Sequence, residues 1–246
     1  MKTRLSYLTA LMLFSGVLIF SAKTLPAQTV VPLPEEHFGF LPGSDRNLFS
    51  YGELIGYLKK CEAASRRIRL VEIGRSPMGK PMYIAFISSP ENIARLERLR
   101  EINRELALNA EISQEEIEKL VSEGKVFFLA TLSMHSTEVA PTQAAPLIAY
   151  DLLTTDEPEK LAFLEDVVYM MVPCHNPDGM DMVVDHYLRY KGTKYEGSSM
   201  PGIYHKYVGH DNNRDFITLS QEDNRIISGI YSKEWFPQVM VEKHQM

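Results

Sequence analysis

His135 and Glu138 are the residues whose types and spacing most clearly suggest chemistry in this sequence. They lie three residues apart, directly after an apolar and β-branched run at residues 126–132 that has the pattern of a buried strand. A neutral imidazole and a carboxylate on one turn can both reach a single cation, and such nitrogen and oxygen ligands suit Zn²⁺. A His-x-x-Glu pair also arises by chance, so on spacing alone it could equally be the solvent-facing start of a helix.

A third candidate ligand, His244, follows another apolar run near the end of the sequence. Catalytic zinc sites use three protein ligands and keep a fourth position for water. Loops at the carboxyl ends of buried strands are where α/β enzymes place their chemistry. This arrangement predicts that His135, Glu138 and His244 converge on one zinc ion.

The elements that must position these residues are strands alternating with helices. The pattern predicts a hairpin at 68–73 and 81–88, helices at 48–64, 90–108, 113–121 and 220–234, and later strands at 166–173 and 235–241. The helices from 90 to 121 read as a solvated insertion, and 191–210 as a long loop. The alternation indicates an α/β fold, a mainly parallel (mixed) twisted sheet with helices on both faces.

The first residues have the pattern of a secretory signal peptide. Lys2 and Arg4 precede an apolar run at 8–20, and small residues follow, which predicts cleavage after residue 27. The run is shorter than the roughly 20 residues of a membrane span. We therefore expect a secreted or periplasmic protein with no stable membrane span in its mature form, the alternative being an uncleaved anchor.

Length and composition fit an ordinary globular protein. The chain has 246 residues, a net charge of −6 and 45% hydrophobic residues, enough for one sizeable α/β domain. No basic tract with interleaved aromatic residues suggests a nucleic-acid partner. Cys61 lies on a predicted surface helix and Cys174 ends a predicted strand. We expect both thiols to be unpaired.

Five motifs, taken in order, resemble the zinc carboxypeptidases of the carboxypeptidase A type. They are the turn GRSPMGKP at 74–81, His135-Ser-Thr-Glu138, Asn176-Pro-Asp-Gly179, the pair Asn213-Arg214, and His244 after a strand. The resemblance covers about 70–246. It implies one zinc ion on His135, Glu138 and His244, and a peptide substrate whose free C-terminal carboxylate is bound by Asn213 and Arg214.

The sequence also departs from that family pattern. Thr137 stands where many members have Arg, which puts a secondary substrate contact in doubt. By its spacing in the family, the arginine that stabilises the oxyanion corresponds to Lys191 in this sequence, and Arg189 lies two residues earlier. Both residues remain candidates for that role. The catalytic Glu of the family would lie beyond residue 246. We therefore expect a lead-in at 28–47, extended in form, followed by part of a catalytic domain at 48–246.

The resemblance predicts a metallocarboxypeptidase that hydrolyses the C-terminal peptide bond of peptides. Two alternatives remain open at this stage. One is an amidase or deacylase on the same zinc scaffold, and the other is a non-catalytic zinc- or peptide-binding module. His210 or Asp211 could orient a metal ligand, whereas His175, His186 and His205 fit loop or packing positions better.

Overall fold

The structure is a computed structural model that describes residues 30–202 and 211–245. The predicted signal peptide, residues 1–27, lies outside the described residues. Within the described ranges, no helix is both long and apolar enough to cross a membrane.

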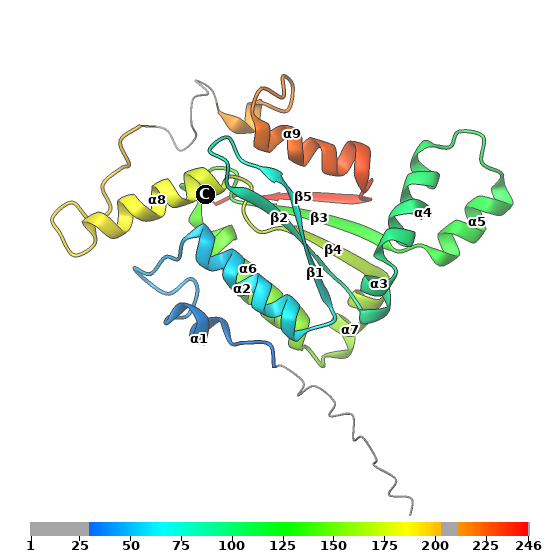
Figure 1. Cartoon of the computed structure of the whole chain (residues 1–246), viewed down its shortest axis with the longest axis horizontal. Helices are drawn as coiled ribbons and strands as arrows, with labels where there is room; N and C mark the ends of the chain where they lie inside the picture. The colour runs from blue at the N-terminus through cyan, green and yellow to red at the C-terminus, as the bar shows by residue number, and fades with distance from the viewer. Residues whose placement is uncertain (1–29, 203–210, 246) are drawn as a thin grey trace, which may run out of the picture.

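A five-stranded mixed sheet forms the centre of the fold (Figure 1). Its strands are β1 (Ile68–Arg75), β2 (Pro81–Ile87), β3 (Val126–Leu132), β4 (Val167–Val172) and β5 (Val239–Lys243), in the spatial order β1-β2-β4-β3-β5. β1 and β2 form the predicted antiparallel hairpin, and β2 is antiparallel to β4. β3 is parallel to both β4 and β5. The α/β class and the mixed sheet are therefore as predicted.

Helices cover both faces of this sheet. The α-helices are α1 (Pro34–Phe38), α2 (Tyr51–Ala64), α3 (Pro90–Ala94), α4 (Leu96–Leu108), α5 (Gln114–Glu123), α6 (Val139–Thr154), α7 (Pro158–Asp166), α8 (Pro177–Tyr190) and α9 (Glu222–Gly229). The short turns η1 (Asn212–Arg214) and η2 (Ile230–Glu234) flank α9. In Figure 1, α2 and α6 lie on one side of the sheet, α9 lies on the other, and α4 and α5 project from one end.

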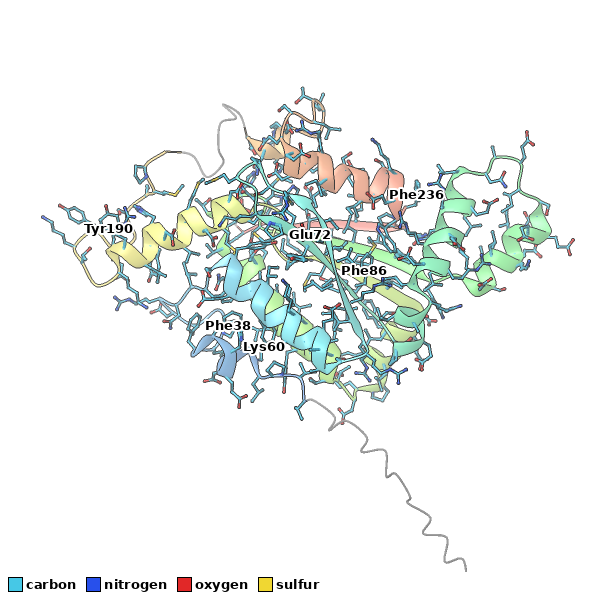
Figure 2. The ribbon with its side chains drawn as sticks, in the orientation of Figure 1. Phe38, Lys60, Glu72, Phe86, Tyr190 and Phe236 are labelled. Atoms are coloured by element: carbon cyan, nitrogen blue, oxygen red, sulfur yellow. The ribbon has the colours of Figure 1, made fainter. Side chains whose placement is uncertain are left out.

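Alternate strand residues enter two separate hydrophobic cores, because successive side chains of a strand point to opposite faces. On β2, Ala85 and Ile87 pack with the buried face of α2, whereas Ile84 and Phe86 enter the core beneath α4 and η2. Phe86 lies 4.3 Å from Trp235 between ring centroids, and Figure 2 shows Phe86 at the middle of the sheet. The inner strands are thus covered on both faces, whereas the edge strand β5, which leads to His244, is partly exposed.

One expectation about local structure needs correction. The segment expected to be an extended lead-in contains the short helix α1, whose last residue, Phe38, stacks on Phe49 at 4.2 Å between centroids. Cys61 lies on α2, which has an exposed outer face as expected of a surface helix, but its own side chain is fully buried in the core beneath that helix. The buried face of α2 therefore includes it. Cys61 and Cys174 are both free, as predicted.

The helix that follows β4 begins at the Asn-Pro-Asp-Gly turn. Asn176 caps α8, because its Oδ1 accepts the Gly179 N–H at 2.9 Å. Asp178 accepts hydrogen bonds from Ser76 Oγ at 2.7 Å and from the Met78 N–H at 2.9 Å. This turn therefore joins the start of α8 to the β1–β2 hairpin, which explains its structural role.

Candidate metal centre

The candidate ligands meet because β3 and β5 are adjacent parallel strands. Leu132, the last residue of β3, pairs with Lys243, the last residue of β5. The two chains therefore leave the sheet side by side, and His244 emerges next to the loop that carries His135 and Glu138. The Leu132 carbonyl also accepts the His175 N–H at 2.8 Å, so β4 ends at the same edge.

The loop after β3 is shaped by Ser133. Its backbone has a positive φ of 49°, which is uncommon for a residue with a side chain and turns the chain sharply out of the strand. Ser133 Oγ donates to the Glu138 carbonyl at 2.7 Å and accepts the Thr142 N–H at 3.0 Å. These bonds hold Glu138 at the start of α6, with its side chain beside His135.

His135, Glu138 and His244 form a compact cluster. Each offers one ligand atom, and these atoms lie within 4.8 Å of one another. Glu138 lies between the two imidazoles, with Oε1 at 2.8 Å from His135 Nδ1 and Oε2 at 2.8 Å from His244 Nδ1. The side chains of these residues are 16%, 20% and 29% exposed, in that order. The cluster is therefore largely covered yet open to solvent on one side.

Asp211 fixes the orientation of the first imidazole. Its Oδ1 lies 2.8 Å from His135 Nε2 and also accepts the Asn213 N–H at 2.8 Å. A carboxylate on one ring nitrogen of a histidine selects the tautomer and directs the other nitrogen toward a metal. With Asp211 on Nε2, the Nδ1 atom of His135 faces Glu138 and the cluster.

The cluster has a negative electrostatic character. Burial would raise the pKa of Glu138, but hydrogen bonds from His135, the Gln245 N–H and His244 outweigh it and keep the pKa below its usual value. The same balance of burial against a bond from His135 lowers the pKa of Asp211. Burial would lower the pKa of His135, yet its bonds to the two carboxylates raise it. Both carboxylates are therefore ionised at neutral pH, which favours a cation.

The donor set of this cluster fits zinc. Two imidazole nitrogens and one carboxylate oxygen are the ligands of a common class of catalytic zinc site, which leaves one position for water or substrate. The two Nδ1 atoms are directed at the same carboxylate. His135, Glu138 and His244 are therefore the residues that would hold the ion.

Comparison with known proteins identifies the family. Residues 54–236, more than half of the chain, match the sequence model of a family described as zinc carboxypeptidase. The chain belongs to the zinc carboxypeptidase family. No curated protein sequence matches it.

Solved metallocarboxypeptidases share the fold of this zinc carboxypeptidase family member. Carboxypeptidase A from Helicoverpa armigera is 14% identical, with a TM-score of 0.51 over 86% of this chain and 51% of its own. The metallo-carboxypeptidase from Burkholderia cenocepacia is also 14% identical, with a TM-score of 0.52 over 80% and 41%. The enzyme from Pseudomonas aeruginosa, in complex with (2-guanidinoethylmercapto)succinic acid, is 11% identical, with a TM-score of 0.52 over 80% and 40%. The chain spans about half the length of these structures or less.

A buried polar network lies behind the first candidate ligand of this family member. Asn212 Nδ2 donates to the Met134 carbonyl at 2.8 Å, directly before the candidate ligand His135. Asn224 Nδ2 donates to the Asn212 carbonyl at 2.7 Å, and Asn224 Oδ1 lies 2.8 Å from His175 Nε2. Asn212, Asn224 and His175 are fully buried. The network therefore connects the end of β4 and the start of α9 to the loop that carries the ligand.

Sequence reasoning did not find this network, because buried amides leave no periodic signal. Asn212 and Asn224 match no motif, and the sequence around His175 favours a loop or packing role. The sequence does offer Asp211 as an orienting residue, and the structure places its carboxylate on His135. The only hint of this network in the sequence is that Asp211 and Asn212 come directly before the Asn213-Arg214 pair.

We predict that the buried imidazole of His175 makes the folded protein less stable in acid. Burial lowers the pKa of this imidazole to about 4, against the bond to Asn224, which raises it. The unfolded chain, with an ordinary histidine pKa of about 6.5, binds the proton first as pH falls. Stability is therefore present above about pH 6.5 and is lost toward pH 4, by up to about 3 kcal/mol.

The change that tests this is His175→Gln, which keeps a donor toward Asn224 but does not titrate. Urea unfolding at pH 7 and pH 4.5 should show a smaller acid loss in this variant than in the native protein. His37→Gln, at a partly exposed histidine of α1, is the matched control and should keep the native loss. Equal acid losses in all three proteins would contradict the assignment.

The predicted carboxylate-binding pair lies close to the cluster. Asn213 and Arg214 belong to η1, which follows Asp211 directly. Asn213 is partly buried, and Arg214 is exposed, with its Nη1 at 3.3 Å from the Asn213 carbonyl. The charge of Arg214 also contributes to the low pKa of Asp211. Two residues that could bind an anion thus lie beside the cluster of His135, Glu138 and His244.

The two oxyanion candidates are not brought to the cluster. Arg189 and Lys191 are exposed at the outer end of α8, and Lys191 Nζ donates to Asn47 Oδ1 at 3.2 Å. α8 begins beside the cluster, where Ser136 Oγ donates to the Asn176 carbonyl, and has 14 residues. At 1.5 Å per residue such a helix extends about 20 Å outward. Spacing along the sequence did not reveal that a regular helix would separate these cations from the ligands.

Proposed function

We propose that the protein is a zinc-dependent metallocarboxypeptidase that hydrolyses the C-terminal peptide bond of peptides. The observation that supports this most strongly is the convergence of His135, Glu138 and His244 at one edge of a carboxypeptidase-type sheet. When bound there, zinc would polarise the scissile carbonyl and lower the pKa of a coordinated water. The residues of the chain hold the ion and orient the substrate.

Each residue of the site has a distinct part in this proposal. Glu138 accepts from both imidazoles and keeps them directed at one point. Asp211 keeps the Nε2 atom of His135 occupied, so that Nδ1 is the atom available to a metal. Asn213 and Arg214 follow Asp211 in the turn η1 and bind the terminal carboxylate of the substrate, Arg214 by a charged hydrogen bond. This arrangement favours peptides with a free C-terminus.

Arg214→Ala is expected to lower kcat/KM for peptides with a free C-terminal carboxylate by roughly 10- to 100-fold, because hydrogen bonds between charged groups contribute about 1.5–3 kcal/mol. Amidated peptides carry no such carboxylate and should be affected little. Release of the C-terminal residue from matched free and amidated peptides measures both rates.

The matched control for this test is Arg225→Ala, at an exposed arginine of α9 that pairs with Glu222. It should leave both rates unchanged. If Arg214→Ala slowed free and amidated peptides equally, Arg214 would not bind the carboxylate. Release of an acyl group in place of an amino acid would favour the deacylase reading.

The proposed place of action is outside the cytoplasm. The support is the sequence at residues 1–27, in which Lys2 and Arg4 precede an apolar run too short for an ordinary membrane span. The mature part would then comprise the segment at 28–47 and the part of a catalytic domain at 48–246.

A further inference from the structure

A chain of hydrogen bonds leaves the sheet at the end of β3. It begins at the Leu132 carbonyl, which accepts the His175 N–H at 2.8 Å. The imidazole of His175 is fully buried, and its Nε2 atom lies 2.8 Å from Oδ1 of Asn224, a fully buried residue of α9. The backbone and the side chain of one residue therefore join the end of β3 to α9.

The same chain of hydrogen bonds returns to the exit of β3. Asn224 Nδ2 donates to the Asn212 carbonyl at 2.7 Å, and Asn212 Nδ2 donates to the Met134 carbonyl at 2.8 Å. Leu132 and Met134 are the two neighbours of Ser133, whose positive φ turns the backbone out of the strand. The bonds thus form a closed hydrogen-bond chain that fixes both sides of this turn.

The amide of Asn224 can face its neighbours in only one way. Its Nδ2 atom lies near two acceptors, the Asn212 carbonyl at 2.7 Å and Asp215 Oδ2 at 3.3 Å. The nitrogen must occupy that place, because an oxygen there would face two other oxygens. Oδ1 is therefore the acceptor that faces His175, and the imidazole carries a hydrogen on Nε2. Asn224 is thus both donor and acceptor in the closed chain.

The turn that this closed chain holds directs the candidate metal ligands. A positive φ is unfavourable for a residue with a side chain and persists only where the surrounding structure enforces it. Ser133 has a φ of 49°, and His135 and Glu138 follow it in the same loop. Another backbone conformation at Ser133 would redirect both side chains. The closed hydrogen-bond chain therefore explains why the ligands keep one arrangement.

The same bonds place the pair that is proposed to bind the terminal carboxylate. Asn212 is the first residue of η1, which continues with Asn213 and Arg214. Asp211, directly before η1, has its Oδ1 atom 2.8 Å from His135 Nε2. A shift of η1 relative to the sheet would therefore move the orienting carboxylate and the carboxylate-binding pair together.

We propose that Asn224 is a positioning residue of the metal centre, which acts through this closed hydrogen-bond chain. Its amide holds η1 against the end of β4 and so keeps the turn at Ser133, with the ligand loop that follows, in one conformation. The inference rests on the proposed function for the identity of the ion and for the role of Arg214. The spacing between the candidate ligands and the carboxylate-binding pair is then set from α9.

Binding of Co²⁺ to the metal-free protein tests the role of Asn224 without any hydrolysis. Cobalt takes the same nitrogen and oxygen ligands as zinc, and its visible absorption depends on the geometry of those ligands. Asn224→Leu keeps the approximate size of the side chain and removes both polar groups of the amide. We expect the affinity for Co²⁺ to fall by about ten-fold, as is usual for groups that orient a metal ligand, and the absorption spectrum to change.

Asn92→Leu is the matched control for this change. Asn92 is the third residue of α3, as Asn224 is of α9, and both side chains are buried. Asn92 Nδ2 donates to the Glu165 carbonyl at 2.9 Å, just before β4 begins, and so at the end of that strand opposite to His175. This variant should also be less stable to urea, but its affinity for Co²⁺ and its spectrum should stay native.

Asn212→Leu is a second and milder variant, which decides the question if Asn224→Leu does not fold. Among the described residues, Asn212 Oδ1 has no hydrogen-bond partner, so the side chain loses only its bond to the Met134 carbonyl. It should weaken Co²⁺ binding and change the spectrum in the same direction. Native affinity and spectrum in the folded variants of Asn224 and Asn212, or equal changes in Asn92→Leu, would overturn the proposal.

Hydrolysis by the zinc-loaded protein separates this inference from the proposed function. Asn224→Leu should lower the preference for free over amidated C-termini, as a ratio of kcat/KM, by about ten-fold, the lower end of the effect of one charged hydrogen bond. If the native protein cleaves no peptide but the Co²⁺ results are as expected, the positioning role stands and the carboxypeptidase assignment fails. If it cleaves peptides, and neither Co²⁺ binding nor the preference changes in Asn224→Leu, the assignment stands and the positioning role fails.

Discussion

Glu138→Ala is expected to lower the affinity for zinc by more than about 100-fold. Residues that only orient a ligand typically contribute 10- to 100-fold to metal affinity, and a ligand contributes more. Glu138 also lies between the two imidazoles, at 2.8 Å from each Nδ1 atom. Its removal therefore takes away one ligand and the group that aligns the other two. Competition with a chromogenic chelator measures the affinity.

The control for this change is Glu242→Ala, because the Glu242 carboxylate also lies next to His244 but is not positioned to bind the same metal ion. Its Oε2 lies 3.9 Å from His244 Nε2, on the far side of that ring from the cluster contact. Loss of zinc affinity should be small in Glu242→Ala. Equal losses of zinc affinity in the two variants would mean that the site attracts cations only by its negative charge. Native zinc affinity in Glu138→Ala would contradict the assignment of the zinc site.

The convergence of the three candidate ligands was predictable from sequence because it follows from strand order. Residues 126–132 and the run before His244 each read as buried strands. Parallel strands end at a common edge, so the two loops had to approach one another. The structure adds that β3 and β5 are direct neighbours, which neither strand pattern shows. Strand existence is a local property, whereas pairing is settled by packing of the whole chain.

The surroundings of the ligands were much less predictable. The network from Asn212 through Asn224 to His175 depends on side chains that meet only after α9 packs against the sheet. The segment 28–47 lacks periodicity in its sequence, and the packing of its described part, residues 30–47, depends on Phe38 and on contacts distant in sequence. Arg189 and Lys191 are oxyanion candidates only by their spacing along the sequence. Such spacing cannot distinguish a loop that returns to the site from a helix that leads away from it.

Asp215→Ala is expected to destabilise the protein by about 3–4 kcal/mol, because it removes a carboxylate that accepts several hydrogen bonds and leaves the buried Gln221 N–H without its acceptor. Asp215 is fully buried. It accepts from the Gln221 N–H at 2.8 Å, from Thr218 Oγ1 at 2.9 Å and from the N–H and hydroxyl of Ser220. Its carboxylate also contacts Asn224 Nδ2 at 3.3 Å. One carboxylate thus orders the whole turn that precedes α9.

The ionised state of Asp215 gives this prediction a pH dependence. Burial would raise its pKa, but the hydrogen bonds from Ser220, the Gln221 N–H and Thr218 hold it well below its usual range. A folded pKa below the unfolded value of about 3.9 means that the unfolded state binds protons first. The contribution of Asp215 to stability is therefore complete above about pH 4 and decreases as pH falls further.

Urea unfolding of the metal-free protein at pH 7 and at pH 3 separates the two effects. Asp215→Asn, which keeps one acceptor oxygen, should lose less stability than Asp215→Ala at pH 7, and both should approach the native protein at pH 3. Asp185→Ala, at an exposed residue of α8, is the control and should stay within about 0.5 kcal/mol of native. Because Asp215 ends η1 and Asp211, which contacts His135, begins it, Asp215→Ala should also weaken zinc binding. Unchanged stability at pH 7 would show that these donors find other acceptors, and that the turn before α9 does not depend on Asp215.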